Sequence, residues 1–276
     1  MKRTINCKGK LIDLKTPKVM GILNVTPDSF FNNSRVVSDE KMLKKVASML
    51  SDGAAFIDIG AYSSRPGAPF VTEGEEQSRL FPVLELVLNE FPDVLISVDT
   101  FRSKVASSAI DMGAAIINDI SAGDMDVGMF DVIAEQQVPY IMMHKRGTPQ
   151  TMNSLNNYKD LILDITDELQ LKINRLEKKG VNDIIVDPGL GFAKDTKQNY
   201  EIIKKLKSFE ILGHPILIGA SRKSMIYKVL ECAPDEALNG STVVHTASLL
   251  GGASILRVHD VKEAVEAVKI TNLLKK

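Results

Sequence analysis

The sequence predicts an α/β fold, a single (β/α)₈ barrel (TIM barrel) with an N-terminal β-hairpin, and three observations support this prediction. Short apolar runs rich in β-branched residues recur eight times along the 276 residues. Such runs are typical of parallel strands buried on both faces. Helical patterns separate several of them, as crossover connections require. The length also suits this barrel, which typically needs about 250 residues.

A doubly wound open sheet is the alternative fold. It is less favoured because the chain has no Gly-x-Gly-x-x-Gly motif and no change of composition between its halves. We therefore expect one active face at the carboxyl ends of the barrel strands, where such barrels carry their sites.

The elements follow in order. Residues 1–15, with a turn at Gly9, predict a hairpin that plugs one end of the barrel, and 19–276 form the barrel itself. The predicted strands are 19–23, 55–59, 94–98, 115–117, 140–143, 184–187, 216–218 and 254–258.

The helix signals are caps and stops. Ser38 is predicted to cap a helix that Gly53 ends, and Thr72-Glu73-Gly74-Glu75 reads as a capping box. Pro82 predicts a kink or a late start in that second helix. Further helices are predicted near 105–113, 158–179 (the longest), 241–250 and from residue 261, with one short helix before 241.

Composition narrows the function classes. The formal net charge is −1, so no basic field attracts nucleic acid or an anionic membrane. No run approaches the ~20 apolar residues of a membrane helix, and no signal peptide is visible. Cys7 and Cys232 lie far apart without metal-ligand spacing, which favours a reduced, cytoplasmic protein.

Polar side chains stand at or just beyond the strand ends: Asn24, Asp58, Asp99, Asn118, His144, Asp187, Lys223, Arg257 and His259. The acids and amides from strands three, four and six suit a planar heterocycle with ring N–H and amino groups, since a carboxylate accepts two parallel N–H bonds. Lys223, Arg257 and His259, from strands seven and eight, suit an anion such as phosphate. The combination indicates loss of a phosphate-type leaving group, with the carboxylates stabilising a cation on the ring.

Several of these residues have structural alternatives. Asp58 is followed by more strand, which favours a structural hydrogen-bonding role, and Asp119 is expected to orient the loop around Asn118. Asp260 fits an N-cap, and His144 fits a core histidine with satisfied ring nitrogens. For Arg257 a structural Arg–Asp pair competes with anion binding, whereas packing does not explain a lysine at position 223.

Seven segments, in order, resemble the dihydropteroate synthase family of folate biosynthesis. They are 20–30 (MGILNVTPDSF), 64–67 (SRPG), 98–100 (VDT), 117–120 (INDI), 187–192 (DPGLGF), 221–224 (SRKS) and 257–260 (RVHD). Each segment alone is a weak signal, but all seven in the family order are specific.

The resemblance implies a homodimeric barrel that condenses 6-hydroxymethyl-7,8-dihydropterin diphosphate with 4-aminobenzoate, releasing pyrophosphate, with Mg²⁺ near Asn24 and sulfonamides as inhibitors. The implied catalytic residues are Asp99, Asp187, Lys223 and Arg257. The implied pterin contacts are Asp99, Asn118, Met142, Asp187 and Lys223, and the implied diphosphate contacts are Asn24, Arg65, Arg257 and His259. The implied aminobenzoate contacts are Phe30, Ser64, Arg65, Pro66, Phe192, Lys223 and Ser224, beneath loops 24–37 and 63–72.

The resemblance also implies a dissociative reaction, in which diphosphate leaves before the arylamine attacks. Two alternatives remain open. A pterin-binding methyltransferase domain would share the pterin-side acids but would not need the cluster of Lys223, Arg257 and His259. A non-catalytic pterin-binding module would bind the pterin without turnover.

Overall fold

The structure is a computed structural model that describes residues 2–25, 35–62, 71–148, 151–152 and 155–275, without the side chains of 35–38. Four residues of the predicted site, Phe30, Ser64, Arg65 and Pro66, lie outside the described residues. Among the residues it describes, no helix has the length and apolar character needed to cross a membrane.

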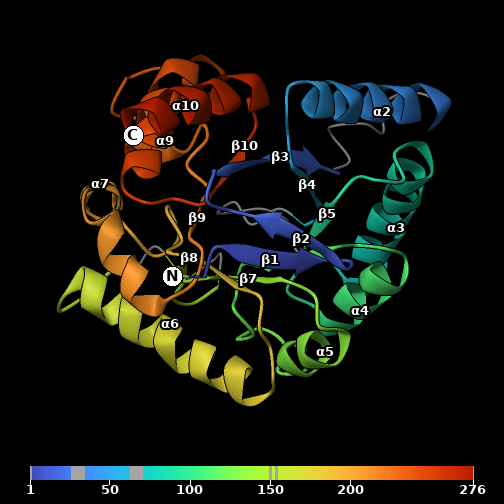
Figure 1. The fold of residues 1–276 in the computed structure, drawn as a ribbon, viewed down its shortest axis with the longest axis horizontal. Helices are drawn as coiled ribbons and strands as arrows, with labels where there is room; N and C mark the ends of the chain where they lie inside the picture. Colours follow the sequence, from blue (N-terminus) through green and yellow to red (C-terminus); the bar gives the residue numbers. More distant parts are fainter. Residues whose placement is uncertain (1, 26–34, 63–70, 149–150, 153–154, 276) are drawn as a thin grey trace.

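Eight parallel strands form the barrel and confirm the predicted fold (Figure 1). They are β3 (Lys18–Asn24), β4 (Phe56–Gly60), β5 (Ile96–Asp99), β6 (Ile116–Asp119), β7 (Tyr140–Met143), β8 (Ile184–Asp187), β9 (Leu217–Ile218) and β10 (Ile255–Val258). Their order is β8-β7-β6-β5-β4-β3-β10-β9, and a parallel bridge between Val186 and Ile216 joins the two ends. The sheet therefore closes on itself.

Helices surround the strands (Figure 1). They are α2 (Arg35–Ser51), α3 (Glu73–Glu90), α4 (Ser103–Asp111), α5 (Met129–Gln136), α6 (Leu161–Lys178), α7 (Thr196–Lys204), α8 (Ser224–Tyr227), α9 (Leu238–Leu250) and α10 (Val261–Leu274), with 3₁₀ turns η2 (Leu206–Leu212) and η3 (Pro234–Glu236). The sequence did not predict α5, α7, η2 or η3.

Three details of the predicted helices differ from the structure. Helix α2 begins at Arg35, so Ser38 lies in its first turn and does not precede it. Helix α3 begins at Glu73 with Thr72 as its N-cap, and Pro82 lies inside it, so the predicted late start is wrong. Helix α6 shares the greatest length, 18 residues, with α3.

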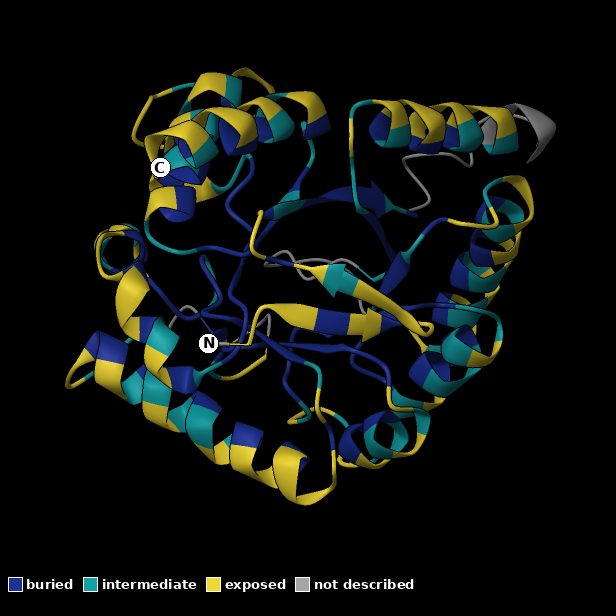
Figure 2. Cartoon of the chain, viewed as in Figure 1, coloured by how far each residue is buried: buried dark blue, intermediate teal, exposed yellow. Residues whose placement is uncertain are grey.

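The barrel strands are almost entirely buried, as the dark colour of nearly the whole barrel in Figure 2 shows. Their two faces pack in different cores. Alternate strand residues such as Val98 and Val186 pack against the helices. The others, such as Phe56 and Ile185, fill the barrel together with Ile5 of the hairpin. Strands β1 (Thr4–Cys7) and β2 (Lys10–Asp13) pair antiparallel across this inner core, which confirms the predicted plug.

The register sets polar residues from several strands at one height. Asn24 pairs with Gly60, Gly60 with Asp99, and Asp99 with Asn118. Paired residues of parallel strands point to the same face of the sheet. The carboxyl end of the barrel therefore carries a ring of polar side chains above the apolar inner core.

Candidate active site

An ion-pair network occupies the centre of this ring. The Arg257 guanidinium donates from Nε to Asp58 Oδ2 at 2.6 Å and from Nη2 to Asp99 Oδ2 at 2.7 Å. The acids and the bases of the ring are thus in direct contact at this point, and the predicted separation into an acidic and a basic side is wrong for Arg257. Barrel closure explains the contact, because β10 lies beside β3, which lies beside β4.

Asp58 is fully buried and joins three other strands to β4. Its Oδ1 accepts a hydrogen bond of 2.6 Å from Ser97 Oγ, and its Oδ2 accepts from Asn118 Nδ2 at 3.3 Å as well as from Arg257. The predicted structural hydrogen-bonding role is confirmed. The structure adds that Asp58 fixes the orientation of two residues of the predicted substrate site.

We expect Ser97→Ala to lower the free energy of unfolding by about 2 kcal/mol, the usual worth of a buried hydrogen bond to a charged group. Pterin affinity should change less than about threefold, because Asp58 keeps its bonds to Arg257 and Asn118. Chemical denaturation and calorimetry measure the two quantities. Ser51→Ala, which removes an exposed serine bonded to Ser48 O, is the control; equal stability of the two variants would contradict the assignment.

Asp187 ends β8 at the start of a tight turn. Its Oδ1 accepts from the Gly189 backbone N–H at 2.7 Å, while its backbone oxygen accepts from His144 N at 2.8 Å. Gly189 has φ +72°, and a Cβ there would lie 1.9 Å from His144 O, so only glycine fits. The turn directs the carboxylate into the ring and leaves Oδ2 for a ligand.

Lys223 reaches the same space from the N-terminal end of α8. Its Nζ donates to Leu190 O at 2.6 Å and lies 4.9 Å from the centre of the Phe192 ring. Ser224, the next residue, is exposed at the start of α8. The structure thus brings Asp187, Phe192 and Lys223 together, as predicted.

Burial shifts the pKa values of the polar side chains at the carboxyl end of the barrel. It raises the pKa of Asp99 to about 7, although Arg257 acts in the opposite direction, and it raises the pKa of Asp187 despite Lys223. Burial lowers the pKa of Lys223 to about 8, with Asp187 opposing the shift. For Arg257 the two carboxylates outweigh burial and raise the pKa further, so this side chain stays charged.

His259 lies just beyond β10, next to Ser221. The Ser221 Oγ accepts from the His259 backbone N–H at 3.1 Å and lies 3.2 Å from its Nδ1. Burial and the nearby Arg257 lower the pKa of His259 to about 4. His259 is therefore neutral at pH 7 and can offer an anion an N–H donor but no charge, unlike the cation that the sequence suggested.

Asp260 occupies the N-cap position of α10, but its side chain makes no capping hydrogen bond. It accepts instead from Arg222 Nε at 2.9 Å and Nη2 at 2.7 Å. A bidentate arginine outcompetes the backbone N–H groups for this carboxylate. The N-cap prediction for Asp260 is therefore wrong in its side-chain role.

Asp119 does orient its loop, accepting from Ser121 and Gly123.

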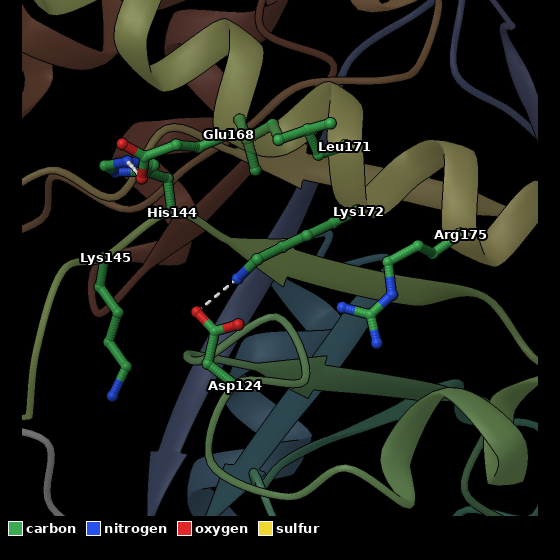
Figure 3. A pocket seen from close by; sticks show the side chains of 8 residues that line it. Asp124, His144, Lys145, Glu168, Leu171, Lys172 and Arg175 are labelled. Atoms are coloured by element: carbon green, nitrogen blue, oxygen red, sulfur yellow. Dashed lines mark hydrogen bonds and ion pairs between the residues drawn. The ribbon is translucent and has the colours of Figure 1, made fainter.

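His144 is a buried histidine with both ring nitrogens satisfied, as predicted. Its Nε2 lies 3.0 Å from Glu168 Oε2, and its Nδ1 lies 3.0 Å from Lys194 Nζ. Burial lowers its pKa to about 4. Figure 3 shows His144 facing Glu168 at one wall of a cavity of about 240 Å³. Its lining is Asp124, His144, Lys145, Glu168, Leu169, Leu171, Lys172 and Arg175, so of the strand-end residues only His144 touches it.

The predicted pterin contact Met142 lies on the wrong face of β7. It pairs with Val186 and packs in the outer core against the helices, whereas Met143 pairs with Asp187. Met143 packs with Phe101 and Ile120, next to Phe192. We correct the prediction to Met143; in a run of two methionines, the sequence carries no signal of which one faces inward.

Asn24 ends β3 and is the predicted metal ligand. Within the described residues, no group of three or more His, Cys, Asp or Glu side chains could hold a metal ion. A carboxamide oxygen at the ring nevertheless fits Mg²⁺, which usually takes one or two protein oxygens together with phosphate oxygens and water. The donor set therefore suits a metal that arrives with a diphosphate.

Comparisons with known proteins place this geometry in context. The family model described as pterin binding enzyme matches residues 20–259. A dihydropteroate synthase of Bacillus subtilis is 42% identical over 258 residues, covering 93% of this chain and 88% of the relative. The mitochondrial folate synthesis bifunctional protein of Arabidopsis thaliana is 43% identical over 274 residues, covering 93% of this chain but only 49% of the relative, so the chain spans about half of that protein.

One solved structure extends the similarity to three dimensions. The Yersinia pestis dihydropteroate synthase in complex with a sulfonamide drug has a TM-score of 0.92 and 39% identity, with 99% of each chain covered. The ring at the carboxyl end of the barrel therefore belongs to a fold shared over nearly the whole chain.

Proposed function

The chain belongs to the pterin binding enzyme family and, within it, to the dihydropteroate synthases, and from this premise we propose that it condenses 6-hydroxymethyl-7,8-dihydropterin diphosphate with 4-aminobenzoate to give 7,8-dihydropteroate and pyrophosphate. The observation that carries the proposal is the convergence of Asp187, Lys223, Asn118 and the Asp99–Arg257 pair at one end of the barrel. This arrangement offers acceptors for a ring and cations for a leaving group within one site.

The pterin ring lies between the acids and Lys223. Asp187 accepts from the 2-amino group and N3 through its two oxygens, since Oδ2 makes no other hydrogen bond and Oδ1, which accepts from the Gly189 N–H, has a second lone pair. Lys223 donates to the ring carbonyl side, Asn118 and Asp99 bind the remaining edge, and Met143 packs against it. Phe192 and Ser224 would border the aminobenzoate subsite, to which the family resemblance also assigns Phe30, Ser64, Arg65 and Pro66.

The diphosphate binds on the β3–β10 side. Arg257 keeps three guanidinium N–H groups beyond those that bond Asp58 and Asp99, and His259 adds a neutral donor. The family resemblance also assigns Arg65 to this subsite. Asn24 would hold Mg²⁺, which when bound neutralises charge on the leaving diphosphate.

The reaction is dissociative. As the C–O bond to diphosphate breaks, Arg257 and His259 stabilise the departing oxygens, and the carboxylates of Asp99 and Asp187 favour the cation left on the pterin methylene. The aminobenzoate nitrogen then attacks that carbon and gives up one of its protons, which the departed pyrophosphate takes up. No covalent bond to the protein is needed, and exclusion of water protects the cation.

The test is turnover with both substrates and Mg²⁺. We expect one pyrophosphate per dihydropteroate formed, and no pyrophosphate from the pterin diphosphate alone beyond slow hydrolysis. Methyl transfer to a corrinoid without pyrophosphate release would support the methyltransferase alternative. Pterin binding without turnover in the presence of Mg²⁺ would support the non-catalytic module.

We further propose a cytoplasmic homodimer that sulfonamides inhibit at the aminobenzoate subsite. Helices α9 and α10 pack together and expose apolar side chains on their outer faces: Val243, Leu250, Ile270, Leu273 and Leu274. A second copy of the chain would bury these side chains. Light scattering measures the mass in solution.

A further inference from the structure

Lys194 follows the turn of residues 187–192 and is nine-tenths buried, although an ammonium group is costly to bury. Its Nζ lies 3.0 Å from Gly189 O, 2.9 Å from Phe192 O and 3.0 Å from His144 Nδ1, and the His144 backbone oxygen is 3.5 Å away. Neither the fold nor the ring of substrate residues accounts for this position.

The donors and acceptors around Lys194 match in number. An ammonium has three N–H groups, and three acceptors lie within 3.0 Å of Nζ. His144 can accept because its Nε2 faces the Glu168 carboxylate and therefore carries the ring proton, which leaves Nδ1 with a lone pair. The contacts thus run from the turn through Lys194 and His144 to helix α6.

We propose that Lys194 is a positioning residue of the pterin site, whose ammonium ties the turn bearing Asp187 and Phe192 to the end of β7 and to α6. Its consequence for substrate rests on the proposed function, but its hold on the turn does not. Lys194 touches no reacting atom in this role; it acts through the backbone carbonyls on either side of Leu190.

The turn needs such a tie because its backbone is unusual. Gly189, Gly191 and Ala193 all have positive φ, at +72°, +80° and +50°. Lys223 holds Leu190 O from the substrate side, while Lys194 holds Gly189 O and Phe192 O from behind. Without Lys194, Phe192 O loses its donor and Gly189 O keeps only the Phe192 backbone N–H at 3.2 Å, so the backbone that orients Asp187 can relax.

The hold of the Lys194 ammonium on the turn should weaken as the pH rises. Burial lowers the pKa of Lys194 to about 7, opposed by Asp187. The charged and titratable groups that face it are His144 beyond β7, Arg146 in the following loop, Glu168 on α6, Asp187 on β8 and Lys223 before α8. As the pH rises through 7, the neutral amine has two N–H donors for three acceptors, so the turn loosens.

The experiment compares Lys194→Met, Lys194→Gln and Lys197→Met with the wild type. Met removes all donors at similar length, Gln keeps two, and Lys197 is an exposed lysine near the start of α7 that serves as control. Hydrogen–deuterium exchange of peptides covering 187–193, corrected for the intrinsic pH dependence of exchange, reports on the turn. Calorimetry with 6-hydroxymethyl-7,8-dihydropterin at pH 6 and pH 9 reports on the site.

We expect turn exchange at least tenfold faster and pterin affinity at least tenfold weaker in Lys194→Met at pH 6, with an intermediate effect in Lys194→Gln and none in Lys197→Met. The affinity ratio of wild type to Lys194→Met should shrink at pH 9, where the wild type has lost its ammonium. A defect of packing alone would leave that ratio independent of pH and would overturn the proposal.

The outcomes separate this inference from the proposed function. If the wild type binds the pterin but the turn of Lys194→Met exchanges as slowly as that of the wild type, the role of Lys194 is overturned and the proposed function is not. Faster exchange in a protein whose wild type binds no pterin supports the tie and overturns the function. If Lys194→Met does not fold, Lys194→Gln carries the same comparison.

Discussion

Asp187→Asn is expected to lower kcat/KM for the pterin diphosphate about 100-fold, or about 3 kcal/mol in transition-state binding. The substituted side chain keeps an oxygen for the Gly189 N–H but presents an NH₂ group where Oδ2 stood. This NH₂ group then faces the N–H donors of the pterin edge, and the negative charge that favours the pterin cation is gone. Both losses act in the transition state, so kcat should fall as well as affinity.

Stability separates this effect from misfolding. Because burial raises the pKa of Asp187, the folded state already disfavours its charge, and Asp187→Asn should unfold at the wild-type denaturant concentration or higher. Asp167→Asn, at an exposed position of α6, is the matched control. Near-normal kcat/KM in Asp187→Asn would remove this residue from its assigned role.

The strands and their polar ends were predictable because the signal for each is local. A run such as 184–187 is apolar and β-branched, and the polar residue that follows marks the edge of the sheet. Strand-end position alone was enough to bring Asn118 and Asp187 together, and Lys223 joins them from the segment between β9 and α8. In a closed barrel of parallel strands, the carboxyl ends of all the strands lie at the same end of the barrel.

Two short helices were not predicted, and only one of them lacked a clear signal. Helix α5 has only eight residues, too few for a clear helical period. Helix α7 did carry a usable signal, since Asp195 and Gln198 form a reciprocal capping box.

Contacts between distant residues could not be predicted from local pattern. Arg257 bonds Asp58 across 199 positions of sequence, and its choice of Asp58 and Asp99 depends on how the sheet closes. Whether Met142 faces inward or outward depends on the alternation of the strand to within one residue. Two adjacent methionines carry no signal of that alternation. The same holds for Lys194, whose acceptors are backbone oxygens that only the folded turn brings together.

Arg257→Ala is expected to lower the free energy of unfolding by about 3–5 kcal/mol at pH 8, because it leaves Asp58 and Asp99 without their cation. The loss should be smaller at pH 5. The pKa of Asp99 is about 7 in the folded protein even with Arg257 present, and it rises further without it, against an ordinary value of 3.8. Both folded proteins keep a proton on Asp99 that the unfolded chain releases, so both lose stability as the pH rises from about 4 to about 7. Above about 7 only the variant, with its higher folded pKa, continues to lose stability, and its deficit relative to the wild type grows there.

The same substitution tests the anion subsite. Binding of the pterin diphosphate should weaken far more than binding of the free pterin alcohol, since only the ester carries the phosphate oxygens that we propose Arg257 binds. Arg257→Lys keeps the charge near Asp58 and Asp99 and so should retain most of the stability, while its single ammonium cannot serve the two carboxylates and the diphosphate together. Denaturation at pH 5 and pH 8 and calorimetry with both ligands measure these effects. Equal losses for ester and alcohol in a folded Arg257→Ala protein would limit Arg257 to its bonds with the two aspartates, and the diphosphate would then have to be bound by Asn24, Arg65, His259 and Mg²⁺.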